Sequence, residues 1–249
     1  MAKLMHFFPL TIFQSKVAVA EADRRLMTDA ILEMSRNRVS QLNPGTAWTG
    51  DLNGHELLHN DPRFAKLFAS FDQPLQEYLE VFKIDQKRVR LYFTRSWGTV
   101  FRRGDSTQAH SHMQSHISLV YYLSKPNGSS GIGFIDKEAP NQFAPNIFGP
   151  SMARAGILRE MTQLNTQKVY VEPQQDDVLI FPSAALHEIP RSSSDQPRMS
   201  IACDIVATVL DSKGLEYMLP DPMHWKAVGA RPAADLRMPV VPVPGTPGR

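Results

Sequence analysis

Apolar residues recur at helical spacing in the first third of the chain. Between residues 18 and 37 they fall on one side of a helix and charged residues on the other, and Asp61-Pro62 is a typical start for a second helix. The second apolar stripe has to break or kink at Pro74, and it continues to residue 82. We therefore predict helical support over residues 18–82.

The pattern changes after Lys87, where apolar and polar residues begin to alternate. Alternation with a period of two is typical of a half-buried strand. Short segments of this kind follow at 89–93, 99–102, 117–123, 131–135, 168–171, 177–181 and 199–209. Many short strands behind two helices favour a mainly β fold with N-terminal helices, a sandwich or jelly roll whose β core spans residues 88–209.

Two segments fit neither pattern. Residues 138–166 contain prolines and small residues, with a short helix expected near 151–161. A connection of this length inside a compact β domain is usually functional or mobile, so we interpret it as a lid-like insertion. Residues 231–249 are rich in proline. We predict a single domain over residues 1–230, followed by an extended tail.

Composition limits the partners of the chain. Lys and Arg number 27 against 25 Asp and Glu, a net charge of +2, which leaves no basic excess to neutralise nucleic acid. The single cysteine excludes an intramolecular disulfide, and no apolar run approaches a membrane span in length. His6 and Pro9 interrupt the apolar residues 4–13, so a first strand fits better than a secretion signal, and we expect a cytoplasmic protein.

Histidines suggest a metal site. His110 and His112 lie two residues apart, so on a strand they point to the same side, as does His116 if the strand stays regular. Strands distant in sequence lie side by side in a jelly roll, so His187 could complete the group. Such a set of imidazoles can hold a transition metal and leave positions open, whereas the alternative is a group of surface or capping histidines.

Arg198 and Ser200 follow His187 at the head of an alternating strand and face the same way. A guanidinium is suited to binding a carboxylate through two parallel hydrogen bonds, and a hydroxyl beside it adds a donor. A lone arginine would more often form a surface salt bridge. Beside a metal site, this pair is a candidate anchor for a dicarboxylate cosubstrate.

Several motifs occur in a fixed order along the chain. They are the segments 8–13, 97–105, 110–112, 118–123, 133–136, 176–183 with the histidine at 187, and 198–202. Together they resemble the core of the 2-oxoglutarate- and Fe(II)-dependent oxygenases of bacteria and phages, over roughly residues 7–208. The resemblance implies a double-stranded β-helix, a cupin-like jelly roll, with iron at its open end.

The resemblance also implies roles for individual residues, with Fe(II) and 2-oxoglutarate as cofactors. His110 and His187 would be metal ligands. Arg198 would pair with the far carboxylate of 2-oxoglutarate, and Ser200 would assist.

Two further positions concern the same carboxylate. Tyr121 and Tyr122 are adjacent on a strand, so only one of them can face inward and bond the cosubstrate. Thr99 stands where the family usually has asparagine, which leaves open the contact expected from that position beside the site.

His112 stands where the wider superfamily has Asp or Glu. A third imidazole leaves the site one unit more positive, which favours a doubly negative cosubstrate but weakens retention of the metal, so nickel, cobalt or zinc could compete. We interpret His112 as the third ligand, with Asp105 or Asp136 as the alternative carboxylate. We assign His116 a role beside the substrate or behind the ligands, and Asp136 is equally well read as a turn residue.

These observations predict a dioxygenase that uses molecular oxygen, hydroxylates a small molecule or peptide, and releases succinate and CO2. The alternatives are a cupin-like three-histidine dioxygenase, a non-catalytic metal-binding jelly roll, and a structural protein. Arg198 separates the 2-oxoglutarate-dependent dioxygenase from the three-histidine dioxygenase, because the latter needs no carboxylate anchor. The sequence does not reveal the substrate, and pairing into a homodimer is typical of such jelly rolls.

Overall fold

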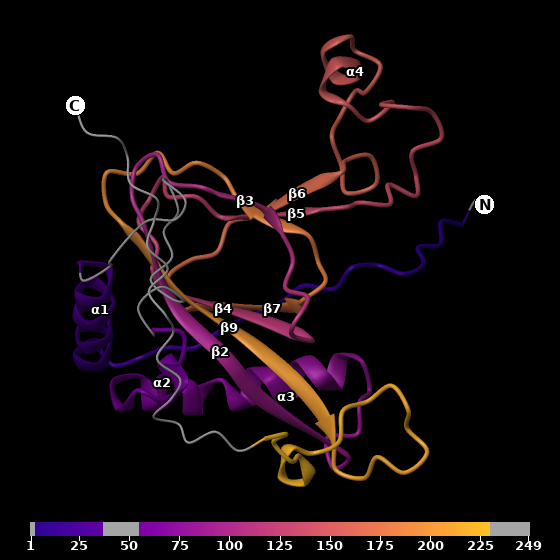
Figure 1. The fold of residues 1–249 in the computed structure, drawn as a ribbon. Helices are drawn as coiled ribbons and strands as arrows, with labels where there is room; N and C mark the ends of the chain where they lie inside the picture. Colours follow the sequence, from indigo (N-terminus) through magenta and orange to yellow (C-terminus); the bar gives the residue numbers. More distant parts are fainter. Residues whose placement is uncertain (1–2, 37–54, 230–249) are drawn as a thin grey trace, which may run out of the picture.

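Two antiparallel sheets face each other in the computed structural model, which describes residues 3–36 and 55–229 (Figure 1). The strands are β1 (Phe13–Lys16), β2 (Val89–Phe101), β3 (Thr107–His110), β4 (Ile117–Ser124), β5 (Ile132–Ile135), β6 (Lys168–Val171), β7 (Asp177–Pro182), β8 (His187–Ile189) and β9 (Arg198–Val209). The larger sheet has the order β1-β7-β4-β9-β2 and the smaller one β3-β8-β5-β6. From β2 to β9 the chain alternates between the two sheets, except that β5 and β6 are neighbours in the smaller sheet, and this is the winding of a jelly roll.

The helices support the larger sheet. They are α1 (Glu21–Arg36), α2 (Ala65–Ser70), α3 (Asp72–Val81) and the short α4 (Pro150–Arg154), with 3-10 turns at Leu58–Asn60, Pro62–Phe64 and Pro222–His224. Figure 1 shows α1, α2 and α3 on the outer face of the larger sheet. Among the described helices, none combines the length and the apolar character needed to cross a membrane.

The break in the second helical stripe falls at Phe71, just before Pro74. Pro74 therefore lies in the first turn of α3, where its missing N–H removes no helical hydrogen bond. The break that the sequence predicts is present, three residues earlier than the proline itself. The proline-rich segment 231–249 and the part of the helical region over 37–54 lie outside the described residues.

Apolar side chains form two layers. The larger core lies between the helices and the larger sheet and includes Ile31, Phe71 and Tyr121. The smaller cluster lies between the two sheets and includes Tyr122 and Phe181. The adjacent residues Tyr121 and Tyr122 therefore belong to different layers, as alternation along β4 requires.

Two strand predictions change in the structure. The segments 89–93 and 99–102 belong to one long strand, β2, with a register shift between Phe93 and Arg95. Strands β3 and β8 are additional, because each is too short and too polar to alternate visibly. The insertion 138–166 joins β5 to β6 and projects away from the sheets (Figure 1).

Candidate metal and cosubstrate site

Three histidines converge where β3 meets β8. His110 ends β3 and lies opposite His187, the first residue of β8. His112 comes from the turn after β3, and its backbone N–H donates to the carbonyl of Ser183 at 2.9 Å. One ring nitrogen of each histidine lies within 4.8 Å of those of the other two, close enough for the three to hold one metal ion. The structure thus brings together the three side chains that the sequence analysis selected for a metal.

The hydrogen bonds of the rings define which nitrogen is free. Nδ1 of His110 donates to the carbonyl of Gln108 at 2.8 Å, and Nδ1 of His187 donates to the carbonyl of Ala185 at 2.9 Å. A carbonyl oxygen only accepts, so Nδ1 carries the proton and Nε2 keeps its lone pair. Both rings are thereby fixed in the tautomer that binds a metal through Nε2.

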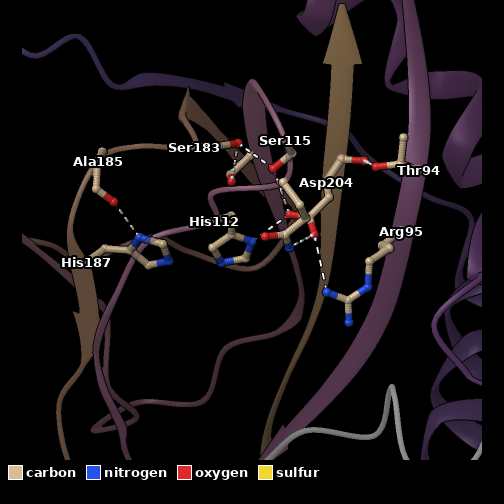
Figure 2. A network of polar contacts seen from close by, with 10 residues as sticks. Thr94, Arg95, His112, Ser115, Ser183, Ala185, His187 and Asp204 are labelled. Atoms are coloured by element: carbon tan, nitrogen blue, oxygen red, sulfur yellow. Dashed lines mark hydrogen bonds and ion pairs between the residues drawn. The ribbon is translucent and has the colours of Figure 1, made fainter.

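Asp204 fixes the third ring (Figure 2). Nδ1 of His112 donates to Oδ1 of Asp204 at 2.5 Å, and Gln114 and Ser115 donate to the same carboxyl group at 2.9 and 3.2 Å. The guanidinium of Arg95 lies 3.7 Å away. A carboxylate behind an imidazole orients the ring and makes it a more basic ligand.

Asp204 is fully buried in the middle of β9 and is charged. Burial alone would raise its pKa, but the hydrogen bond and charge of His112, the Gln114 bond and the Arg95 charge bring that pKa below its ordinary value. Its role behind His112 was not predicted from the sequence. The available signal was an acidic residue within the apolar run 201–207 of β9.

Burial also shifts the pKa values of His110 and His187. It lowers the pKa of His187 to about 4, and it lowers the pKa of His110. Both rings are therefore neutral at neutral pH, which is the form that coordinates a metal.

The histidines line a cavity of about 630 Å³ that lies between the sheets. Its wall also includes Thr99, Tyr122 and Ser200, and the hydroxyl oxygens of Thr99 and Ser200 lie 2.6 Å apart. A cavity of this size is typical of small-molecule sites.

Arg198 lies against this wall and is fully buried. Its guanidinium carbon is 4.3 Å from the ring centre of Phe101 and 5.5 Å from that of Tyr122, two rings that border the cavity. Nη1 donates to the carbonyl of Ser130 at 2.8 Å, whereas Nε and Nη2 have no partner among the described residues. Burial lowers the pKa of Arg198. A buried cation with two free donors fits a carboxylate of a bound anion.

Of the two tyrosines proposed for the cosubstrate, Tyr121 points away from the cavity. Its hydroxyl donates to Oδ1 of Asp176 at 2.6 Å, on the helix side of the larger sheet. It therefore does not reach the cavity, and Tyr122 is the member of the pair that does.

Three other candidates lie away from the histidine cluster. His116 is exposed, and its Nδ1 accepts from the backbone of Ala207 at 3.1 Å, because β3 ends at His110 and the chain turns before His116. Asp136 accepts two backbone hydrogen bonds within its own turn, and Asp105 accepts one from the backbone of Arg102. Neither carboxylate is part of the described cluster of ligating groups, which consists of imidazoles.

The insertion 138–166 also lies away from the cavity. None of its residues lines the cavity in the described structure, and α4 projects outward (Figure 1). The arrangement shown is therefore not that of a closed lid.

A comparison with known families favours one reading of the histidine cluster. Residues 95–204 match the family described as "Putative 2OG-Fe(II) oxygenase". The match runs from within β2 to within β9 and includes the three histidines, Arg198 and Asp204. It confirms the predicted resemblance to a family of oxygenases whose description names 2-oxoglutarate and iron.

Two solved structures are similar to this chain. AviO1 from Streptomyces viridochromogenes Tue57 superposes with a TM-score of 0.51 at 12% identity, over 79% of this chain and 90% of that chain. HygX from Streptomyces hygroscopicus, solved with nickel and 2-oxoglutarate bound, has a TM-score of 0.49 at 14% identity, over 79% and 83% of the two chains. No curated protein sequence is significantly similar. The likeness to AviO1 and the family match together confirm the double-stranded β-helix with N-terminal helices.

Proposed function

We propose that the chain is a 2-oxoglutarate- and Fe(II)-dependent dioxygenase that hydroxylates a small-molecule or peptide substrate and releases succinate and CO2. The observation that carries this proposal is the shared cavity: three imidazoles present free Nε2 atoms at one place, and a buried guanidinium with two free donors lies against the wall of the same cavity. The domain predicted over residues 1–230 would hold the whole site.

Each end of the cosubstrate has a matching set of side chains. His110, His112 and His187 would hold the metal, because their Nδ1 atoms are occupied and their Nε2 atoms are free. Arg198 would pair with the far carboxylate, and Ser200 lies beside it on the same face of β9. When bound, iron and 2-oxoglutarate supply the oxidative chemistry that places an oxygen atom in a C–H bond.

The protein's own part is to orient these groups and to exclude water. Phe101, Ile132 and Phe181 form an apolar part of the wall, which limits solvent around the cosubstrate. Tyr122 adds a hydroxyl within that wall, and burial raises its pKa to about 12, so it acts as a neutral donor to the carboxylate. These fixed groups are in place before any ligand binds, as preorganised sites require.

Succinate formation is the direct test. Anaerobically iron-loaded protein is mixed with 2-oxoglutarate and oxygen, with and without a panel of small molecules and peptides, and succinate is measured. We expect slow succinate release alone and faster release with a true substrate. The variant H187A should lose both, whereas H116A should keep both, because His116 lies outside the cavity. Absence of succinate together with absence of 2-oxoglutarate binding would overturn the proposal.

One observation favours a second candidate, a three-histidine dioxygenase that needs no cosubstrate. The described ligating cluster contains imidazoles and no carboxylate, as that class would have. The variant R198A separates the two functions: oxidation of a substrate by R198A at the wild-type rate, without 2-oxoglutarate, would support the second candidate.

A further inference from the structure

Arg191 lies in the wall of the histidine cavity. His187, Ile189 and Arg191 are each two residues apart and all line the cavity, as expected where an extended chain turns every second side chain to one side. Arg191 also borders a second hollow of about 640 Å³, which is lined mainly by polar residues. Its exposed side chain therefore stands between the buried cavity and the surface.

The backbone that carries Arg191 is held on both sides. Before it, the ring of Pro190 fixes that residue's own φ angle. After it, Ser192 forms two backbone hydrogen bonds with the turn after β2: its carbonyl accepts from the N–H of Gly104 and its N–H donates to the carbonyl of Asp105, both at 2.9 Å. A fixed backbone keeps the Arg191 side chain at the wall of the cavity, so that only the side chain itself has to be ordered when it binds a ligand.

Arg191 forms no ion pair or hydrogen bond within the described part of the chain. The acidic residues of neighbouring segments are paired with other bases: Asp195 with Arg103 at 2.7 Å, and Glu188 with Lys168 at 2.6 Å. The cavity wall itself contains no Asp or Glu among the described residues. The wall of the histidine cavity thus offers Arg191 no carboxylate, and Glu172, which borders the second hollow together with Arg191, lies 3.4 Å from Nζ of Lys125.

The charges expected with a metal and 2-oxoglutarate bound also leave Arg191 without a partner. Three neutral imidazoles do not offset a divalent metal, so the two negative charges of 2-oxoglutarate would have to serve both the metal and Arg198, which together carry three positive charges. Asp204 contributes one negative charge behind His112, and Arg95 lies close to it. Arg191 would then remain as an uncompensated cation beside the space left for the substrate.

We propose that Arg191 binds an anionic group of the substrate, a carboxylate or a phosphate. This inference rests on the proposed function, because it assumes that the substrate occupies the cavity beside the cosubstrate. The guanidinium would form charge-assisted hydrogen bonds with two oxygens of the anion. Substrates without a negative group would lose this anchor and would be selected against.

Anion binding to the nickel- and 2-oxoglutarate-loaded protein tests the proposal without knowledge of the substrate. Equilibrium dialysis with labelled inorganic phosphate, and separately with labelled acetate, should show one saturable site, and the tighter of the two anions identifies the group. In R191Q this binding should fall about tenfold or more. R191K should be intermediate, since an ammonium keeps the charge but not the two-pronged geometry. R103Q is the matched control, because Arg103 is exposed, is paired with Asp195 and does not line the cavity.

Three results would overturn the proposal. The first is no saturable anion binding by the wild type, and the second is equal anion binding by R191Q, which would place the anion on the metal. The third is a loss of 2-oxoglutarate binding in R191Q as large as in an Arg198 variant. The last result would assign Arg191 to the cosubstrate. Failure of the proposed function is a separate result, because it appears as absence of 2-oxoglutarate binding in the wild type, and the anion titration can be repeated with the nickel-loaded protein alone.

Discussion

Nδ1 of His112 donates to Oδ1 of Asp204 at 2.5 Å and thereby joins the turn after β3 to the middle of β9. The cluster of imidazoles therefore has a carboxylate one hydrogen bond behind it. Part of the negative charge that an acidic ligand would place on the metal is supplied from this second position. The bond also explains how a residue in a turn can be held as firmly as its partners on strands.

The variant D204N should weaken metal binding by about 10- to 100-fold, since it removes the charge that orients His112 and raises its basicity. Competition between the protein and a chromogenic chelator for nickel measures the affinity. D136N is the control, because Asp136 accepts hydrogen bonds within an exposed turn. Equal nickel affinity in D204N and the wild type would show that Asp204 has no part in the site.

The histidine cluster itself predicts a stability effect of metal. A metal that binds the folded state alone stabilises it by about 2.7 kcal/mol at a concentration 100 times its Kd. We expect nickel to raise the Tm of the wild type and of H116A, and to leave the Tm of H110A and H112A almost unchanged. Differential scanning calorimetry with and without chelator measures the change. If nickel raised the Tm of H112A as far as that of the wild type, His112 would not be a ligand.

The sequence allowed prediction of this site where the signal was local. His110 and His187 stand in motifs whose order resembles a known family, and the alternation in β9 places Arg198 and Ser200 on one face. The partner of His112 was not predictable in the same way. Asp204 meets that ring only because the turn after β3 folds back against β9, which is a relation between segments distant in sequence.

The same limit explains the remaining differences. Alternation states that Tyr121 and Tyr122 face opposite ways, but not which face is covered by helices, so the inward residue could not be chosen. His116 would share the face of His110 and His112 only on a regular strand, and because the chain turns after His110, His116 lies outside the cluster. The fold class depended on many strands at once and was therefore predicted more reliably than any single contact.

The two tyrosines provide a test in which adjacent residues should behave differently. Y121F removes a hydrogen bond to Asp176, a carboxylate that also binds Arg24 at 2.8 Å, and should lower the free energy of unfolding by about 1.5–3 kcal/mol. Y122F should leave stability nearly unchanged, because its hydroxyl has no hydrogen-bond partner among the described residues, and should weaken 2-oxoglutarate binding about fivefold. Urea unfolding and titration of 2-oxoglutarate into nickel-loaded protein measure the two effects. The reverse pattern would mean that the cosubstrate lies on the helix side of the sheet.

Replacing Arg198 should separate stability from binding. The guanidinium is fully buried with two donors that lack partners among the described residues, so in the absence of a ligand it costs stability rather than adding to it. R198M keeps the length of the side chain and its packing on Phe101 while it removes the charge. We expect ligand-free R198M to be as stable as the wild type or more stable, by up to about 4 kcal/mol, and to show no rise in Tm with 2-oxoglutarate. S200A, which keeps the guanidinium of Arg198, should show part of the rise in Tm that 2-oxoglutarate causes in the wild type. If ligand-free R198M were destabilised by about 3 kcal/mol or more, Arg198 would be held by a protein partner and would not be free to receive the cosubstrate.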